Sequence, residues 1–148
     1  MSEPAYQKPD LALVGAEHVA RYRETDGEVG YEWNGVPTLL LTTTGCRTGE
    51  PRTKALIFGR DGEDYLVVAS TGGAPQHPAW YLNLLAHPEA EIQVKGDHIP
   101  VVARAVDSGA EHARLWRTVT GYWPNYDTYQ ARTDRLIPVV VLTPTTDT

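Results

Sequence analysis

The chain has 148 residues, of which 41% are hydrophobic and 22% charged, and its formal net charge is −6. This composition is ordinary for a globular protein, and the negative charge argues against nucleic acid as a main partner, because phosphate binding requires an excess of Lys and Arg. A single cysteine excludes an internal disulfide and favours a reducing compartment.

No apolar run approaches the roughly 20 residues that span a bilayer, and the first residues lack the features of a signal peptide, so we expect a cytoplasmic protein. Residues 1–9 are polar and contain two prolines, and we expect them to be flexible. Residues 10–148 are expected to form one domain. In this domain, apolar spacing with Asp10 as N-cap predicts a helix over Asp10–Tyr22, and the stretch Glu24–Gly35 is expected to be a connector.

Strand-like runs dominate the rest of the chain, and Asp61-Gly62 between two of them predicts a hairpin. Strands are expected at Thr38–Thr44, Lys54–Gly59, Asp64–Ser70, Glu91–Lys95, Pro100–Val106 and Ile137–Thr143. One helix is predicted from Pro78 to His87-Pro88. Another is predicted from the capping-box spacing Ser108–Glu111 to about Thr120, with Gly121 as its stop. These elements indicate an α+β fold built on a small antiparallel barrel.

The loop after the first strand carries a cluster of cations. Arg52 and Lys54 project to one face if their segment is extended, and Arg47 lies across the loop from them. Guanidinium groups bind phosphate or carboxylate in a bidentate manner, and Gly45 and Gly49 let backbone amides approach a ligand. The pattern therefore predicts an anion site, although a solvated hairpin tip is an equal alternative.

A second loop, Ser70–Pro75, joins a strand to the helix at Pro78, and its small residues suit a flat ring or a phosphate. In that helix we expect Trp80, Tyr81, Leu84 and Leu85 to form the buried stripe. Asn83 lies among apolar neighbours and needs hydrogen-bond partners, which a heterocycle or a helix-to-loop bond would supply equally well.

Four aromatic residues gather in eight positions near the C-terminus: Tyr122, Trp123, Tyr126 and Tyr129. Pro124-Asn125 breaks any helix there, and Tyr126 and Tyr129 share a face if the segment is helical. Such rings suit a planar substrate with carbonyl or nitro oxygens, or else form a hydrophobic lid over the barrel.

Catalytic triads, phosphate loops, dinucleotide fingerprints and metal-ligand spacings are all missing from the sequence, so no metal is expected. If the protein is an enzyme, a cofactor must carry the reaction while the protein orients the partners.

Three stretches, TTTGCRTGEPRTKAL, VASTGGAPQHPAWYLNLLAHPE and NYDTYQARTDRLIPVVVLTP, closely resemble successive blocks of the deazaflavin-dependent nitroreductase family. The resemblance runs from about Val36 to Pro144. It implies a split β-barrel with flanking helices and a cytoplasmic, actinobacterial type of oxidoreductase. It also implies hydride transfer from reduced coenzyme F420 to a quinone, enone or nitroaromatic acceptor, as in the F420H2-dependent quinone reductases.

The resemblance also implies roles for individual residues. The coenzyme's anionic tail and the groove beyond it would be bound by Cys46, Arg47, Thr48, Arg52, Thr53, Lys54, Ala55, Leu56 and Ile57. The deazaflavin ring would lie along Val68, Ala69, Ser70, Thr71, Ala79, Trp80, Tyr81, Leu82, Asn83 and Tyr126. Ser70, Tyr126 and Tyr129 are the implied catalytic residues, and the acceptor would be lined by Tyr122, Trp123, Tyr126 and Tyr129.

Two residues depart from the family pattern. Thr71 stands where lysine is expected, and Trp123 stands where tyrosine is common, which makes activity on nitroimidazoles doubtful. Two other functions remain open: an FMN-binding flavoprotein on the same barrel, and a non-catalytic carrier of the coenzyme or an apolar ligand. We expect a monomer, and the mildly amphipathic helix Asp10–Tyr22 gives weak support to peripheral membrane association.

Overall fold

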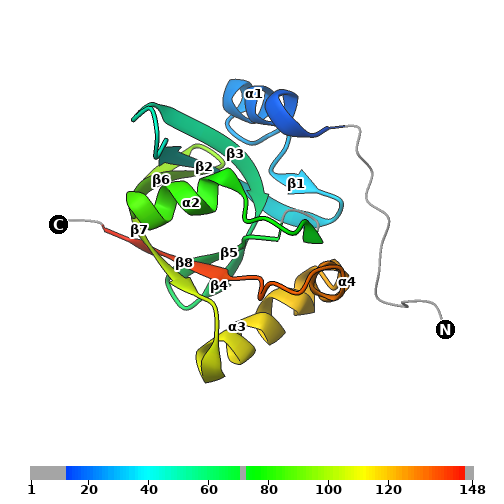
Figure 1. Ribbon diagram of the computed structural model, residues 1–148. Coiled ribbons are helices and arrows are strands. Elements are labelled where there is room, and N and C mark those ends of the chain that lie inside the picture. Colours follow the sequence, from blue (N-terminus) through cyan, green and yellow to red (C-terminus); the bar gives the residue numbers. More distant parts are fainter. Residues whose placement is uncertain (1–12, 71–72, 146–148) are drawn as a thin grey trace.

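The computed structural model describes residues 13–70 and 73–145, which form an α+β structure around one curved antiparallel sheet (Figure 1). The strands are β1 (Glu32–Trp33), β2 (Val36–Thr44), β3 (Pro51–Ile57), β4 (Gly59–Asp61), β5 (Asp64–Val68), β6 (Glu89–Val94), β7 (Asp97–Val106) and β8 (Val139–Pro144). The helices are α1 (Gly15–Thr25), α2 (Ala79–Ala86), α3 (Gly109–Tyr122) and α4 (Asn125–Ala131).

The sheet follows the order β1-β2-β6-β7-β8-β5-β4, and β3 pairs with β2. Because the sheet curls, β3 and β5 come into contact without forming a ladder, and the barrel is split between them. The β2–β3 pairing runs from Thr38↔Ile57 to Thr44↔Pro51, so the two strands form one long hairpin. The split is the feature that makes room for a binding site.

Two hydrophobic clusters lie on the two faces of β5, because successive side chains of a strand point to opposite faces. Tyr65, Val67 and Ala69 pack inside the barrel against α2. Leu66 and Val68 pack outside, under α3 and α4. Figure 1 shows α2 across the inside of the curled sheet, α1 beside β3, and α3 with α4 beyond β8 and β4.

The hairpin predicted at Asp61-Gly62 is confirmed. Asp61 pairs with Asp64, so the two turn residues are Gly62 and Glu63, and Gly62 has φ +63°. The prediction of one strand over Lys54–Gly59 is wrong. β3 begins earlier because Pro51 already pairs with Thr44, and it ends at Ile57, before β4 starts at Gly59.

The helix predicted over Asp10–Tyr22 has different bounds. Leu13 and Val14 are not helical, the helix begins at Gly15, and it continues to Thr25. Asp10, the expected N-cap, lies outside the described residues, as do residues 1–9. Val14 occupies the N-cap position and makes no side-chain capping bond.

The capping box and the stop signal predicted for the helix that begins near Ser108, which is α3, are also wrong. Ser108 Oγ donates to Asp107 instead of capping α3, and Glu111 pairs with Arg104. Gly121 lies inside α3, which runs to Tyr122. Tertiary packing overrides the glycine here, because the chain just beyond it buries Trp123, which is only 1% exposed.

Candidate functional site

A cavity of about 470 Å³ lies at the split of the barrel. Many of the site residues predicted from the sequence line this cavity, and they come from four parts of the fold. These lining residues are Lys54, Ala55, Leu56 and Ile57 from β3, Val68 and Ser70 at the end of β5, Ala79 and Trp80 from α2, and Trp123, Tyr126 and Tyr129 around α4. The fold therefore brings the three sequence blocks together in one place.

The opposite wall consists of residues that the sequence did not single out. Gly15 and His18 come from the start of α1, Val14 precedes that helix, Trp33 comes from β1 and Thr38 from β2. Trp33 stacks at a tilt on Trp123, with ring centroids 5.8 Å apart, and its Nε1 donates to the Leu13 carbonyl at 2.8 Å. The N-terminal helix is thus part of the cavity wall.

The cavity is mainly apolar, and Lys54 is the charged side chain on its wall within the described residues. Tyr126 is 4% exposed and makes an edge-on contact with Tyr129, with centroids 6.1 Å apart. Burial raises the pKa of Tyr126 well above its ordinary value. Its phenol therefore keeps its proton and can donate a hydrogen bond.

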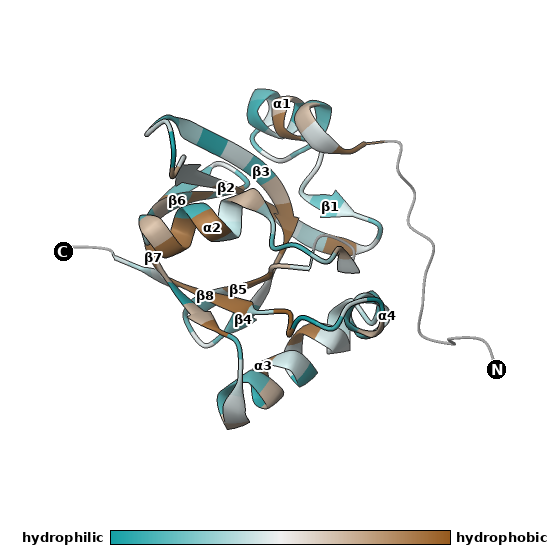
Figure 2. Cartoon of the chain, in the orientation of Figure 1, coloured by the Kyte–Doolittle hydropathy of each residue, from teal (hydrophilic) through white to brown (hydrophobic). Residues whose placement is uncertain are grey.

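A second depression, of about 530 Å³, adjoins the cavity and lies between α1 and β3. The two spaces share Gly15, Lys54 and Ala55. Its walls carry Arg52 and Lys54 from β3 and Arg23 from α1. Figure 2 shows β3 hydrophilic at the end that begins with Pro51 and hydrophobic toward Ile57. The lining of these two adjoining spaces therefore changes from apolar to cationic along one strand.

Arg23 was not predicted as a site residue, yet it is anchored toward the groove. Its Nη2 donates to Thr53 Oγ1 at 2.7 Å, and Thr53 Oγ1 lies 2.8 Å from Thr42 Oγ1. None of the ion pairs formed within the described residues includes Arg47, Arg52 or Lys54. The two β3 cations thus remain available to an anion.

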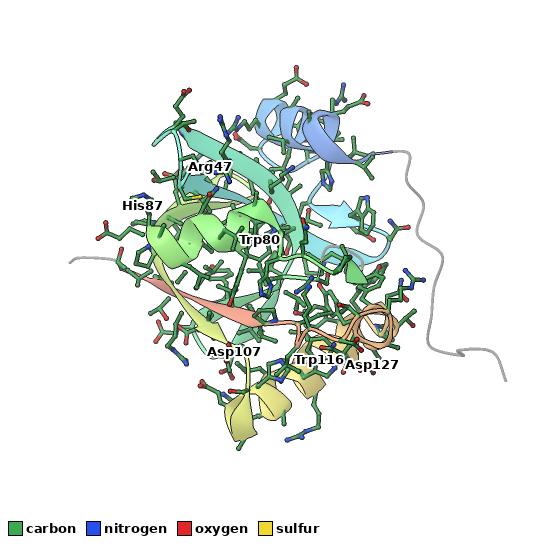
Figure 3. The ribbon with its side chains drawn as sticks, viewed as in Figure 1. Arg47, Trp80, His87, Asp107, Trp116 and Asp127 are labelled. Carbon is green, nitrogen blue, oxygen red and sulfur yellow. The ribbon has the colours of Figure 1, made fainter. Side chains whose placement is uncertain are left out.

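Arg47 lines neither space. It lies on the exposed loop of the β2–β3 hairpin, and Figure 3 shows it on the other side of α2 from Trp116 and Asp127. Cys46 and Thr48 share this exposed loop. The loop is tied to α2 because Asn83 Oδ1 accepts from the Cys46 N–H at 3.0 Å, while Asn83 Nδ2 donates to Thr43 Oγ1. The structure gives Asn83 the helix-to-loop bonds that the sequence left as an alternative.

The edge of β3 that faces the cavity has no strand partner in the described part of the chain. The Phe58 N–H donates to the Pro37 carbonyl at 3.1 Å, which extends the β2–β3 register by one pair. Hydrogen-bonded and non-hydrogen-bonded pairs alternate in an antiparallel ladder. The backbone groups of Leu56 therefore point to β2, whereas those of Ala55 and Ile57 point to the open edge, where they can bind polar atoms of a ligand.

Arg135, which the sequence did not single out, holds the segment that carries Ser70. Its guanidinium donates to the carbonyls of Ala69 at 3.1 Å, Ser70 at 2.9 Å and Ala74 at 2.8 Å. Such a planar fork can satisfy several acceptors at fixed positions. The chain between α4 and β8 thereby fixes the loop between β5 and α2.

Several predicted site residues do not reach the cavity wall. Ala69 and Tyr81 are buried in the inner core, and Leu82 is 44% exposed on α2. Tyr122 packs with the outer core. Thr71 lies outside the described residues. The predicted buried stripe of α2 is wrong at Leu85, which is 59% exposed, and Asn83 is buried in its place.

Two negative observations apply to the described residues. None of their helices combines the length and apolar character required to span a bilayer. No group of three or more His, Cys, Asp and Glu side chains is arranged among them to hold a metal ion.

Comparison with known proteins gives consistent results. A solved structure described as a domain-swapped dimer has 36% identity and a TM-score of 0.69, covering 85% of this chain and 94% of the other. A pyridoxamine 5'-phosphate oxidase-related, FMN binding protein from Nostoc punctiforme has 14% identity and a TM-score of 0.50, covering 91% of this chain and 83% of the other. The second likeness concerns the fold alone, and it confirms the predicted split barrel.

The F420H(2)-dependent quinone reductase Rv1261c of Mycobacterium tuberculosis is 49% identical over 129 residues, which are 85% of this chain and 87% of the relative. The family model described as F420H(2)-dependent quinone reductase matches residues 14–144. The resemblance inferred from the three sequence blocks is therefore confirmed: the chain belongs to the F420H(2)-dependent quinone reductase family.

Proposed function

We propose that this protein transfers a hydride from reduced coenzyme F420 to a quinone. The observation that carries the proposal is the pair of adjoining spaces along β3, which are apolar around Leu56 and Ile57 and cationic around Arg52 and Lys54. A molecule with a flat ring at one end and an anionic tail at the other fits this gradient. Membership of the family supports the same assignment.

The residues present suit both parts of the coenzyme. Val68, Ile57 and Trp80 would hold the ring by apolar contact, and the backbone groups of Ala55 and Ile57 at the open edge would bind its polar atoms. Lys54 and the groove beyond it, with Arg52 and Arg23, would hold the anionic tail. When bound, the coenzyme supplies a hydride from its reduced deazaflavin ring.

The protein's part in the reaction is to position the partners and exclude water. Hydride transfer requires close and aligned approach, which a walled apolar cavity favours. We propose that Ser70, Trp123, Tyr126 and Tyr129 line the acceptor's position, because they surround the cavity away from the cationic groove. Neutral Tyr126 would donate a hydrogen bond to an acceptor oxygen.

Two measurements test this function. Purified protein is titrated with coenzyme F420 and, separately, with FMN, and heats of binding are recorded. The protein with reduced F420 is then mixed anaerobically with 2,3-dimethyl-1,4-naphthoquinone in a stopped-flow instrument. We expect binding of F420 without comparable FMN binding, followed by coenzyme oxidation. Tight FMN binding alone would favour the flavoprotein, and F420 binding without oxidation by any quinone, enone or nitroaromatic would favour the carrier.

A further inference from the structure

Two histidines of the described chain are buried in the same way. His18 on α1 is 5% exposed and His112 on α3 is 8% exposed. Nε2 of each lies 2.8 Å from a backbone carbonyl oxygen, that of Gly30 for His18 and that of Ile137 for His112. A carbonyl only accepts hydrogen bonds, so Nε2 carries a hydrogen in both residues. Each histidine therefore ties its helix to a neighbouring segment.

The two histidines differ in their position relative to the cavity. Of the histidines in the described chain, His18 alone contributes to the cavity wall. A Cβ built on Gly30 would lie 3.0 Å from Cδ2 and 3.2 Å from Nε2 of His18, so that edge of the ring faces Gly30. The Nδ1 atom lies on the opposite edge. Because Nε2 is committed to the Gly30 carbonyl, Nδ1 is the ring nitrogen left for proton exchange.

Quinone reduction requires such an exchange. The hydride carries one hydrogen and two electrons to the quinone. The coenzyme is oxidised because it loses those two electrons. One quinone oxygen becomes an anion, and a proton on that oxygen completes the hydroquinone. An oxyanion that is not neutralised is costly in a mainly apolar cavity, so a donor within reach accelerates the step.

We propose that His18, in its cationic form, gives its Nδ1 proton to the quinone oxygen as the hydride arrives; the inference rests on the function proposed above. The bond that breaks is Nδ1–H, and the bond that forms is O–H of the hydroquinone. The Nε2–H bond to Gly30 is present before and after the transfer, so the neutral imidazole is left in the correct tautomer without rearrangement. Solvent then reprotonates Nδ1.

The other groups around His18 are less suited to the task. Burial raises the pKa of Tyr126, which therefore holds its proton more tightly. Tyr22 is on the same helix as His18 and packs beside Gly30, and burial likewise raises its pKa. Tyr129 from α4 shares the wall, and Lys54 from β3 is the charged side chain that shares it in the described chain. We assign Lys54 to the coenzyme's tail, whose anionic groups would offset its charge.

The variant His18→Gln separates the proposed role from the structural one. The glutamine amide nitrogen can occupy the Nε2 position and donate to Gly30, but it cannot give up a proton. His112→Gln is the matched control, because it makes the same change in a buried histidine away from the cavity. Coenzyme affinity, Tm and single-turnover oxidation by 2,3-dimethyl-1,4-naphthoquinone are measured from about pH 5.5 to 8.5.

We expect both variants to keep the wild-type Tm and to bind F420 within about twofold of wild type. Wild type and His112→Gln should react at similar rates at each pH. His18→Gln should be at least about tenfold slower near pH 6, and its pH profile should differ from theirs. A His18→Gln variant with the wild-type rate and pH profile would overturn the proposal.

A second measurement uses the unmodified protein and decides the matter if His18→Gln does not fold. Histidine ring nitrogens are observed by ¹⁵N NMR in the complex with oxidised F420, before and after addition of the same quinone. Methyl groups occupy carbons 2 and 3 of this quinone, which limits addition of the exposed Cys46 thiol to the quinone ring. We expect the Nδ1 signal of His18 to shift and that of His112 to stay; an unchanged His18 signal would overturn the proposal.

Failure of the two proposals can be told apart. If wild-type protein with reduced F420 oxidises no quinone, the function proposed above is wrong and the His18 role falls with it. If wild type reduces the quinone and His18→Gln does so equally well at every pH, only the His18 role is wrong.

Discussion

Nη1 of Arg135 lies 3.0 Å from Nδ1 of His77, at the connection between β5 and α2. A guanidinium only donates, so Nδ1 of His77 accepts and the ring proton is on Nε2. The His77 ring also contacts the Tyr81 ring at a tilt, with centroids 4.7 Å apart. One arginine thus braces both the Ser70 end of this connection and the histidine that precedes α2.

Arg135→Lys should lower the free energy of unfolding by about 2–3 kcal/mol, because one ammonium cannot replace a fork that reaches three carbonyls and an imidazole. Urea denaturation measures the change, and F420 titration should show weaker binding because Ser70 loses its support. Arg117→Lys, in an exposed arginine of α3, is the control. Equal stability of the two variants would show that the fork contributes nothing.

The His77–Arg135 contact should make stability depend on pH. Burial, and then the charge of Arg135, lower the pKa of His77 below its ordinary value. The folded state therefore binds the proton less tightly than the unfolded state. The contribution is fully present above the unfolded pKa of about 6.5 and is lost as the pH falls through the lower folded value.

His77→Asn places an amide oxygen near the position of Nδ1 and removes the titration. Between about pH 7.5 and 5, we expect wild type to lose more stability than this variant. Urea unfolding at a series of pH values measures the difference. Parallel pH curves for the two proteins would contradict the expected linkage.

The cations of the depression between α1 and β3 should contribute strongly to coenzyme affinity. Arg52→Ala with Lys54→Ala should weaken F420 binding by about ten- to a hundredfold at low salt, and the loss should shrink in about 1 M salt. Arg47→Ala is the informative comparison, because Arg47 lies outside both spaces. An equal loss on replacing Arg47 would mean that the tail continues along the hairpin loop.

Replacing Tyr122 should raise the stability of the protein, unlike the Arg135 substitution. The Tyr122 hydroxyl is buried and has no hydrogen-bond partner within the described residues, and burial raises its pKa. Tyr122→Phe removes the unpaired group, so thermal or urea denaturation should show a gain of about 1 kcal/mol. Quinone turnover should not change, because Tyr122 does not line the cavity. A slower reaction would instead place Tyr122 at the acceptor, as the family resemblance implied.

Local patterns in the sequence predicted the parts of the site that lie on single elements. Arg52 and Lys54 alternate on one strand, and both line the groove. Tyr126 and Tyr129 are three residues apart on a short helix, and their rings are in contact. These relations depend only on the period of a strand or a helix, which sequence reveals directly.

The contributions of α1 could not be predicted in the same way. His18 and Arg23 reach the site because α1 packs on β3, which is separated from it by more than 20 positions of the chain. Nothing in the local spacing of Leu11, Val14 and Val19 indicates which strand the helix will meet. The position of Arg135 likewise depends on the meeting of two loops whose sequences are far apart.

The unpaired edge of β3 has a further consequence for the behaviour of the protein in concentrated solution. An open strand edge is a template for pairing with another chain, and aggregation through such edges is commonly blocked by charged side chains or by a covering helix. Here α1 packs against β3, and Arg52 and Lys54 lie along the strand. On the assignment of this edge to the coenzyme proposed above, the same features would also oppose edge-to-edge association when no coenzyme is bound.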